Sequence, residues 1–394
     1  MTTTEGFEAA GVAAGIKKSR KSDLGLLVST KPCVSAAVYT LNAAAAAPVK
    51  VCREETEAGA LQGIVVNSGA ANACTGEQGL ADARRMVRAA AEACGLPAER
   101  MAVASTGVIG ELLPMERLEA GINEAAAELS RHGGGDFAAA IQTTDRFIKE
   151  GAVKVEFSSG TVTIGACAKG AGMTAPDMAT MLAFITTDAG VPAGLLQDML
   201  MTAASRSFNA VSVDGDMSTN DCVFMFANGA SGVTLEAGSD DTELFTTALA
   251  AVCWGLALKI VADGEGATRV IELKISGAAA PEEAARVART VANSPLVKTA
   301  FYGSDANWGR ILASAGAALA GEPAFLPDVY YEGICVAAGG EAMYGPEAGI
   351  GLDEVMVQQE ISVSLNLNRG EHACTIYFSD LSHDYVTLNA EYTT

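Results

Sequence analysis

The sequence predicts a mixed α+β protein built from layered sheets and helices. Two apolar patterns carry this prediction, and they are interleaved along all 394 residues. Short segments alternate apolar and polar side chains, as strands with one buried face do, while longer segments repeat apolar side chains every three or four residues, as helices do. The chain shows no internal repeat and no low-complexity linker, and its length suits two or three domains.

Strand-like alternation recurs at residues 153–157, 162–164, 271–275, 361–367 and 376–378. A Ser-Ser-Gly turn separates the first two segments, so we expect a hairpin with one buried face. An Asn-Arg-Gly turn separates the last two, so we expect a strand followed by a return strand.

Helical spacing of apolar residues recurs at 83–94, at 195–203, at 242–261 and after Pro281. Gly95 stands where a left-handed residue would end the first helix. The third helix is almost wholly apolar, so we expect it to be buried on most sides. Pro281 and the two acidic residues after it suit the first turn of the fourth helix. The alanine run 43–47 before a proline predicts a turn or a short helix.

Charge and hydropathy exclude several classes of protein. The chain carries 47 acidic against 26 basic residues, a net charge of −21, and has no basic stripe, so we expect no nucleic-acid partner. It has no run of eighteen apolar residues and no basic segment leading into an apolar one at its start. We therefore expect no membrane span, no secretion signal and a cytoplasmic location.

The nine cysteines are scattered singly, without a Cys-x-x-Cys pair. An odd number of isolated cysteines predicts reduced, mostly buried thiols rather than disulfides or a zinc site. We expect neither a metal nor a cofactor.

The most informative segment is 169–188. A glycine-rich stretch that begins at Lys169 runs to an Ala179–Thr180 bond, and an apolar run follows at once. A chain that cut itself at this bond would expose a terminal threonine, whose α-amine has an ordinary pKa of about 7.7–8.0 and can act as the base for its own hydroxyl. Thr180 also begins an alternation typical of a buried strand, which would hold such a nucleophile in place.

Further short segments with distinctive residues lie at Asn67–Gly76, Ala104–Gly110, Ser218–Asp221, Asp263–Gly266, Asn293–Ala300, Ser304–Arg310 and Asn389–Thr394. Together with 169–188, and in this order, they resemble the ornithine acetyltransferases, the glutamate N-acetyltransferases of arginine biosynthesis. The resemblance implies an α/β/β/α layered sandwich similar to N-terminal-nucleophile enzymes, with a smaller C-terminal lobe. It also implies self-cleavage into an α chain of residues 1–179 and a β chain of residues 180–394.

The resemblance assigns roles to individual residues. Thr180 would be the nucleophile after cleavage at Ala179–Thr180, and Thr106 with Gly107 would form the oxyanion hole. Substrate contacts would come from Thr143, Thr144, Lys169, Thr180, Glu265, Asn389 and Thr394, with Asp145 beside them. From the residues alone, Thr106–Gly107 reads as a turn between a strand and a helix, Lys169 as an exposed lysine in a loop, and Glu265 as a solvated acid after a helix.

The implied activity is transfer of the acetyl group from N2-acetylornithine to glutamate, by a ping-pong mechanism through an acetyl-threonine, in an α2β2 assembly. Acetyl-CoA as a second donor, which would make the enzyme bifunctional, stays open. We expect that activity to be weak or absent, because coenzyme A brings several phosphate charges and the acidic chain has no visible basic cluster. Two other hypotheses stay open: an amidase or aminopeptidase that uses water as acceptor, which a threonine rather than a serine nucleophile disfavours, and a non-enzymatic acidic binding protein.

Overall fold

The computed structural model describes residues 1–56, 59–174, 181–343 and 350–391. Contacts divide the chain into two compact units. The larger unit comprises Met1–Asn209, Asp216–Ile260 and Thr393–Thr394, and the smaller one comprises Ala210–Gly215 and Val261–Tyr392. The smaller unit is the C-terminal lobe that the resemblance implied. The predicted cleavage bond Ala179–Thr180 lies outside the described residues, so the predicted chains 1–179 and 180–394 stay a prediction.

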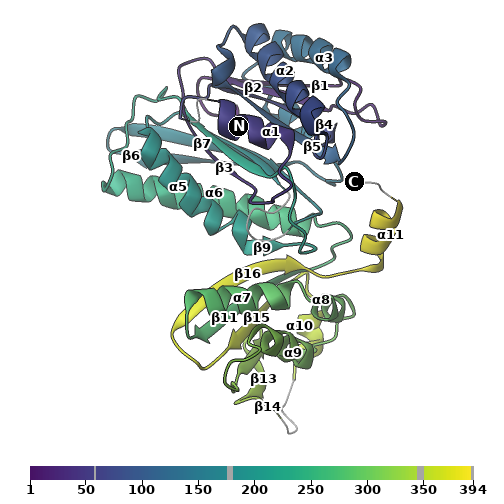
Figure 1. Cartoon of the computed structure of the whole chain (residues 1–394). Coiled ribbons are helices and arrows are strands. Elements are labelled where there is room, and N and C mark those ends of the chain that lie inside the picture. Colours follow the sequence, from purple (N-terminus) through teal and green to yellow (C-terminus); the bar gives the residue numbers. More distant parts are fainter. Residues whose placement is uncertain (57–58, 175–180, 344–349, 392–394) are drawn as a thin grey trace. The chain divides into compact units, whose positions relative to one another are not determined.

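The first sheet of the larger unit has the strand order β1-β2-β4-β5. Its strands are β1 (Phe7–Val12), β2 (Leu24–Ser29), β4 (Gly63–Ala70) and β5 (Met101–Val108). Only β4 and β5 run parallel in this sheet. Helices cover its outer face: α1 (Ala47–Glu55), α2 (Gly76–Cys94) and α3 (Met115–Ala127) (Figure 1).

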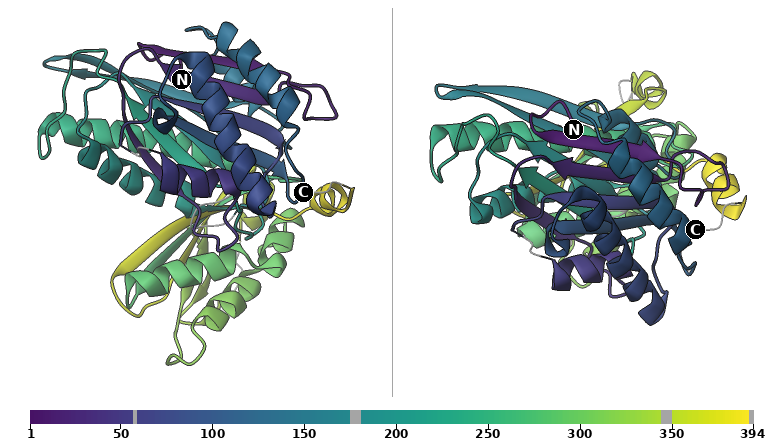
Figure 2. Two further views of the ribbon diagram at one scale, coloured as in Figure 1. Left: turned by 45° about the horizontal axis from the view of Figure 1, so that its top comes forward. Right: turned by 90° about the horizontal axis from the view of Figure 1, so that it is seen from above.

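The second sheet has the order β3-β10-β8-β7-β6. Its strands are β3 (Val34–Tyr39), β6 (Lys149–Phe157), β7 (Gly160–Lys169), β8 (Leu182–Thr187) and β10 (Cys222–Ala227). The helices α5 (Ala193–Ser205) and α6 (Asp240–Ala262) lie along its outer face, as Figures 1 and 2 show. Every residue of β8 and β10 is buried, because one face of this sheet meets the first sheet and the other meets helices.

The two sheets share one apolar core, and α4 (Gly134–Ala140) packs on β1 and β2 beside it. Phe137 of α4 meets Phe184 of the second sheet edge to face, with ring centroids 5.2 Å apart. The predicted α/β/β/α sandwich is therefore confirmed.

The smaller unit is built on a mixed sheet with the order β14-β13-β12-β15-β11-β16-β9. Its strands are β9 (Val211–Ser212), β11 (Val270–Ala278), β12 (Asp328–Tyr331), β13 (Ile334–Ala338), β14 (Glu341–Ala342), β15 (Glu360–Asn366) and β16 (His372–Ser379). Its helices are α7 (Pro281–Ala292), α8 (Pro295–Tyr302), α9 (Trp308–Ala318), α10 (Leu352–Met356) and α11 (His383–Glu391). Helix α7 packs on β11 and β16, so the alternating residues of β11 face an apolar helix.

Several local predictions are confirmed. The hairpin is β6–β7, α2 ends at Gly95 with φ of 67°, and Pro281 opens α7 with two glutamates in its first turn. The alanine run forms a turn that leads into α1. Of the nine cysteines, five are buried, and Cys74 is exposed.

Two local predictions are wrong. Helix α6 is buried on one face only: 39% of its most apolar stretch is buried, and Leu244 is 47% exposed. By length and composition alone α6 could cross a membrane, but the stripe that includes Phe245, Leu249 and Leu256 packs in the core, as in a helix of a globular protein.

The predicted strand and return strand at 361–378 are both present, as β15 and β16. Strands β15 and β16 do not pair, because β11 lies between them, parallel to β15 and antiparallel to β16. The second error concerns the hairpin: β7 is buried on both faces from Val162 on, because β8 covers its second edge and the sheet lies between two layers. A turn between two strands in sequence does not decide which strands pair.

Candidate active site

The predicted oxyanion residues end a strand. Strands β4 and β5 run parallel, so both end at the same edge of the sheet, and Thr106 and Gly107 lie at that end of β5. The expected turn is wrong, because the β4–β5 ladder continues to Val108 through an irregularity at Ala70. Gly107 has φ of 131°, and a Cβ there would lie 2.3 Å from the carbonyl carbon of Gly69. Only glycine fits this close approach of two backbones.

Lys169 is the last residue of β7, and it is 3% exposed rather than solvated in a loop. Its strand keeps pairing with β8 to the end, where Lys169 lies opposite Leu182. The Lys169 ammonium donates a hydrogen bond of 3.2 Å to the Thr106 hydroxyl. Since an ammonium has donors only, that hydroxyl accepts from Lys169, and its own hydrogen stays available for a further oxygen.

Asp145 organises the backbone around these residues. Its carboxylate accepts hydrogen bonds from the Lys149 ammonium at 2.7 Å, from the Gly170 N–H at 2.8 Å and from the Thr143 N–H at 2.9 Å. Burial works to raise the pKa of Asp145, but the charges of Lys169 and Lys149 and the hydrogen bonds outweigh it and lower the pKa to about 2. The carboxylate thus fixes Thr143, one predicted substrate contact, beside the residue that follows Lys169.

Thr144, the next predicted substrate contact, is half-buried in the loop between α4 and β6. It lies directly between Thr143 and Asp145, whose positions the hydrogen bonds of the carboxylate fix.

Lys17 is a third cation in this neighbourhood, after Lys169 and Lys149, and sequence reasoning missed it. The carboxylate of Asp23 accepts the N–H groups of Ala14, Ile16 and Lys17, which shapes the loop before it. Lys17 lies close to Gly69, and its ammonium donates to the Ser22 and Ala140 carbonyls. Burial above all, and the charge of Lys169, lower the pKa of Lys17 to about 8 against the opposing carboxylates. In the sequence, Lys17 belongs to a basic run typical of a solvated loop, so no signal marks it.

The start of β8 is held by Asp221, which sequence reasoning also left without a role. The Met181 N–H donates a hydrogen bond of 3.1 Å to one carboxyl oxygen of Asp221, a residue that is 1% exposed. The segment Ser218–Asp221 entered the resemblance, but it carried no assigned chemistry. Only its position before a buried strand could have marked it.

In the smaller unit, two predicted substrate contacts meet. The Asn389 side-chain amide of α11 donates a hydrogen bond of 2.8 Å to the Glu265 carboxylate. Glu265 lies in the loop after α6, as expected, and it is half-buried. Gly266 allows this loop to approach α11, because a Cβ there would lie 2.4 Å from the Tyr385 nitrogen. The predicted residues Ala179, Thr180 and Thr394 lie outside the described residues.

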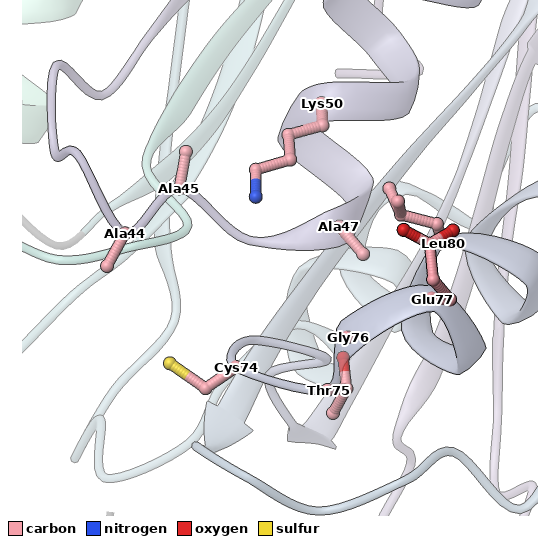
Figure 3. A pocket seen from close by; sticks show the side chains of 9 residues that line it. All are labelled: Ala44, Ala45, Ala47, Lys50, Cys74, Thr75, Gly76, Glu77 and Leu80. Atoms are coloured by element: carbon pink, nitrogen blue, oxygen red, sulfur yellow. The ribbon is translucent and has the colours of Figure 1, made fainter.

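A cavity of about 220 Å³ lies in the larger unit where α1 and α2 begin. Figure 3 shows Lys50 extending toward this space from α1, with Cys74 across from it. None of the predicted site residues lines it. Among the described residues, no three His, Cys, Asp or Glu side chains form a group that could hold a metal ion.

Comparisons with known proteins place the chain in one family. The family model described as the ArgJ family matches residues 8–394. The arginine biosynthesis bifunctional protein ArgJ of Symbiobacterium thermophilum is 49% identical over 100% of this chain and 98% of its own length, and that of Geobacter sulfurreducens is 44% identical over 99% of both. The crystal structure of ornithine acetyltransferase complexed with ornithine from Mycobacterium tuberculosis is 42% identical, with a TM-score of 0.42, over 44% of this chain and 93% of that one. The chain belongs to the ArgJ family.

Proposed function

We propose that this chain is a self-processing acetyltransferase of arginine biosynthesis, which moves the acetyl group of N2-acetylornithine to glutamate. Membership of the ArgJ family over nearly the whole chain supports the pathway. The observation that carries the chemistry is the position of Lys169. Its backbone pairs with Leu182, and its ammonium lies 3.2 Å from the Thr106 hydroxyl. The predicted oxyanion residues therefore lie beside the strand that directly follows Thr180.

Maturation would begin with attack of the Thr180 hydroxyl oxygen on the carbonyl carbon of Ala179. The peptide C–N bond breaks, an ester forms, and the nitrogen of Thr180 is released as an amine. Water then opens the ester, which leaves a carboxylate on Ala179 and a free hydroxyl and amine on Thr180. The products are the chains 1–179 and 180–394, which we propose assemble as α2β2.

In the transfer itself, the Thr180 amine takes the hydroxyl proton while the oxygen attacks the acetyl carbon of N2-acetylornithine. The negative charge that develops on the acetyl oxygen is received by the Thr106 hydroxyl and the Gly107 N–H, an arrangement worth about 3–4 kcal/mol for each donor. The acetyl C–N bond breaks, and ornithine leaves with the proton. The amine of glutamate then attacks the acetyl ester, and the hydroxyl of Thr180 is restored.

The remaining predicted residues would bind the amino-acid parts of the substrates. Lys169 suits a carboxylate, and Glu265, joined to Asn389, suits the ammonium of ornithine. Thr143, Thr144 and Thr394 complete the proposed set of substrate contacts.

Intact-mass measurement tests both halves of this proposal. The purified wild-type protein should give two fragments divided at Ala179–Thr180, and Thr180→Ala should give one intact chain. Brief incubation with N2-acetylornithine, without glutamate, should add one acetyl group to the fragment that begins at Thr180. An active wild-type protein that stays a single chain, or an acetyl group on another residue, would contradict the proposal. Water in place of glutamate as a productive acceptor would favour the amidase alternative.

Acetyl-CoA is the second candidate donor, and the observation that favours it is that the relatives are named bifunctional. We propose glutamate acetylation from acetyl-CoA as the second activity, against our expectation from the net charge. The test compares the rate of N-acetylglutamate formation with acetyl-CoA and with N2-acetylornithine as sole donors. A rate with acetyl-CoA below one hundredth of the other would restore the expectation of a single activity.

A further inference from the structure

A buried carboxyl oxygen without a partner marks Asp221. Among the described residues, only two buried side-chain polar atoms make no hydrogen bond, Asp221 Oδ2 and Tyr39 Oη. Burying a polar atom without a partner costs free energy, and a carboxyl group is more costly than a phenol when it ionises. A native protein that keeps such an atom has a reason that lies outside ordinary packing.

The position of Asp221 relative to β8 is fixed. Strands β10 and β8 run parallel from the pair Cys222–Leu182, and both Asp221 and Cys222 bond to Met181, the residue before Leu182. The Met181 N–H donates to Asp221 Oδ1 at 3.1 Å, and the Cys222 N–H donates to the Met181 carbonyl at 3.3 Å. Asp221 therefore holds the N–H of Met181, the residue that directly follows Thr180 in the sequence.

The backbone around Asp221 leaves it little freedom to move. The Thr40 N–H donates to the Asp221 carbonyl at 2.9 Å, and the preceding Asn220 amide donates to the Ala71 and Ser105 carbonyls at 2.6 and 2.8 Å. Ser105 directly precedes Thr106, so the same segment spans the start of β8 and the end of β5. The unpartnered oxygen is thus held in place rather than free to turn toward solvent.

We propose that Asp221 is a positioning residue for the nucleophile, whose Oδ1 holds the Met181 N–H and whose Oδ2 accepts a hydrogen bond from the α-amino group that cleavage creates on Thr180. This inference rests on the proposed function. The two nitrogens of one residue and its successor lie roughly 3 Å apart through the chain, and the two oxygens of a carboxyl group lie about 2 Å apart. The covalent structure therefore brings the new amine within reach of the free oxygen.

The charges around Asp221 indicate how its carboxyl group would act on the new amine of Thr180. Burial raises the pKa of Asp221 well above its ordinary value, and the Met181 N–H, the Ser218 hydroxyl and the charge of Lys169 from β7 oppose this only in part. Burial therefore favours the protonated, neutral form of this carboxyl group before cleavage. The neighbouring thiol of Cys222 has a raised pKa from burial, and from Cys52 and Asp221, so it adds no charge.

Cleavage then supplies the missing partner. The proton of the Asp221 carboxyl passes to the new amine, which gives a carboxylate beside an ammonium and removes the unpaired buried oxygen. The amine acts as a base only after this ammonium loses its proton. A carboxylate within hydrogen-bond distance stabilises the ammonium, so it raises the pH at which the enzyme becomes active.

The test is the pH profile of kcat/KM for N2-acetylornithine with fully cleaved Asp221→Asn. Asparagine keeps an oxygen for the Met181 N–H but carries no charge, so we expect the pKa of the acidic limb to fall by about one to three units. Asp188→Asn is the matched control, because Asp188 is a 5% exposed aspartate just beyond the far end of β8 that accepts the Thr163 N–H. Its acidic limb should match the wild type. If the pKa of the acidic limb in cleaved Asp221→Asn equals that of the wild type, the inference is overturned. A variant that folds but does not cleave would also overturn it, because the proposed action follows cleavage.

A second measurement needs no change at Asp221. Infrared spectra should show one protonated carboxyl group at pH 7 in the uncleaved Thr180→Ala protein that mature wild-type protein lacks. A mature protein that retains this band contradicts the proton transfer. If the wild type does not cleave at all, the proposed function itself fails; if it cleaves and transfers acetyl groups but neither signal moves, only the role of Asp221 fails.

Discussion

Asp145→Asn should destabilise the protein far more than loss of a surface carboxylate. The side chains of Asp145 and Lys149 are both 0% exposed and lie 2.7 Å apart. The charge of Lys169 also acts on the Asp145 carboxylate. Removal of the negative charge leaves buried ammonium groups without compensation, which costs about 3–5 kcal/mol. For a unit of this size each kcal/mol lowers the thermal midpoint by about 2–4 °C, so we expect a loss of roughly 6–20 °C.

Glu119→Gln is the control, because Glu119 pairs with Arg85 at 2.5 Å on the surface, with side chains 32% and 45% exposed. Exposed pairs contribute little net stability, so its midpoint should change by less than about 4 °C. Adding Lys149→Met to Asp145→Asn should recover part of the loss, since it removes one unpaired ammonium. Equal midpoints for Asp145→Asn and Glu119→Gln, measured by scanning calorimetry, would refute the assignment of a buried charged network.

The pH dependence gives the same network a second test. The pKa of Asp145 is lowered to about 2 from 3.8, so its stabilising effect is complete above about pH 4 and is lost as the pH falls toward 2. That difference corresponds to about 2–3 kcal/mol. Wild-type protein should lose this stability between pH 4 and 2 in chemical denaturation, whereas Asp145→Asn should not.

Three further predictions concern single side chains. Gly107→Ala should lower the free energy of unfolding in urea by at least about 3 kcal/mol, because its Cβ would meet the backbone of the neighbouring strand at 2.3 Å. Gly110→Ala is the control: Gly110 has φ of 87° but open space around it, so the loss should be only about 1–2 kcal/mol. Wild-type stability should rise between about pH 8 and 10, because the pKa of Lys17 is lowered from 10.5 to about 8 in the folded protein. The pKa of buried Lys298 is lowered to about 8 as well, so Lys17→Met should reduce this rise without abolishing it, and Lys18→Met should leave it unchanged. Glu265→Gln should raise KM for N2-acetylornithine about tenfold or more with the thermal midpoint nearly unchanged, and an unaltered KM would contradict its proposed role.

The sequence was sufficient for elements whose stability is decided locally. Gly95, Pro281 and the hairpin turn at 158–160 each supply a backbone conformation that only one kind of local structure uses, and each lies where predicted. The patterns predicted a mixed α+β protein with layered sheets, and the α/β/β/α order of the layers followed from the family resemblance. Pattern alone gave strands and helices but no strand order, which is why β11 between β15 and β16 was not foreseen.

The errors at the candidate site have a common physical cause. Lys169 and Thr106 each stand at a strand end, and a polar residue next to glycine has the local pattern of a solvated loop or turn. Burial at these positions comes from partners distant in sequence: β8 pairs with β7 through Lys169, and Asp145 binds the Gly170 N–H. A single sequence does not contain that information, so the roles of Lys169 and Thr106 came from the family resemblance. No role was predicted for Lys17 or Asp221.

Net charge is a sum over the whole chain and does not describe the charge of one site, which bears on the choice of acetyl donor. The chain as a whole carries −21, yet half-buried Lys17 and buried Lys149 and Lys169 act on the carboxylates of Asp23 and Asp145 in one neighbourhood. Three ammonium groups against two carboxylates leave one positive charge in excess, and a buried excess charge is stabilised by an anion. Both proposed amino-acid substrates carry an α-carboxylate that could supply it. An acidic surface therefore does not exclude an anionic substrate, and the expectation that acetyl-CoA is a poor donor loses the premise that no basic cluster exists. Lys17→Met, which removes the excess charge without touching Lys169, should weaken binding of both amino-acid substrates; a KM for each that stays within twofold of the wild type would show that the excess charge does not attract them.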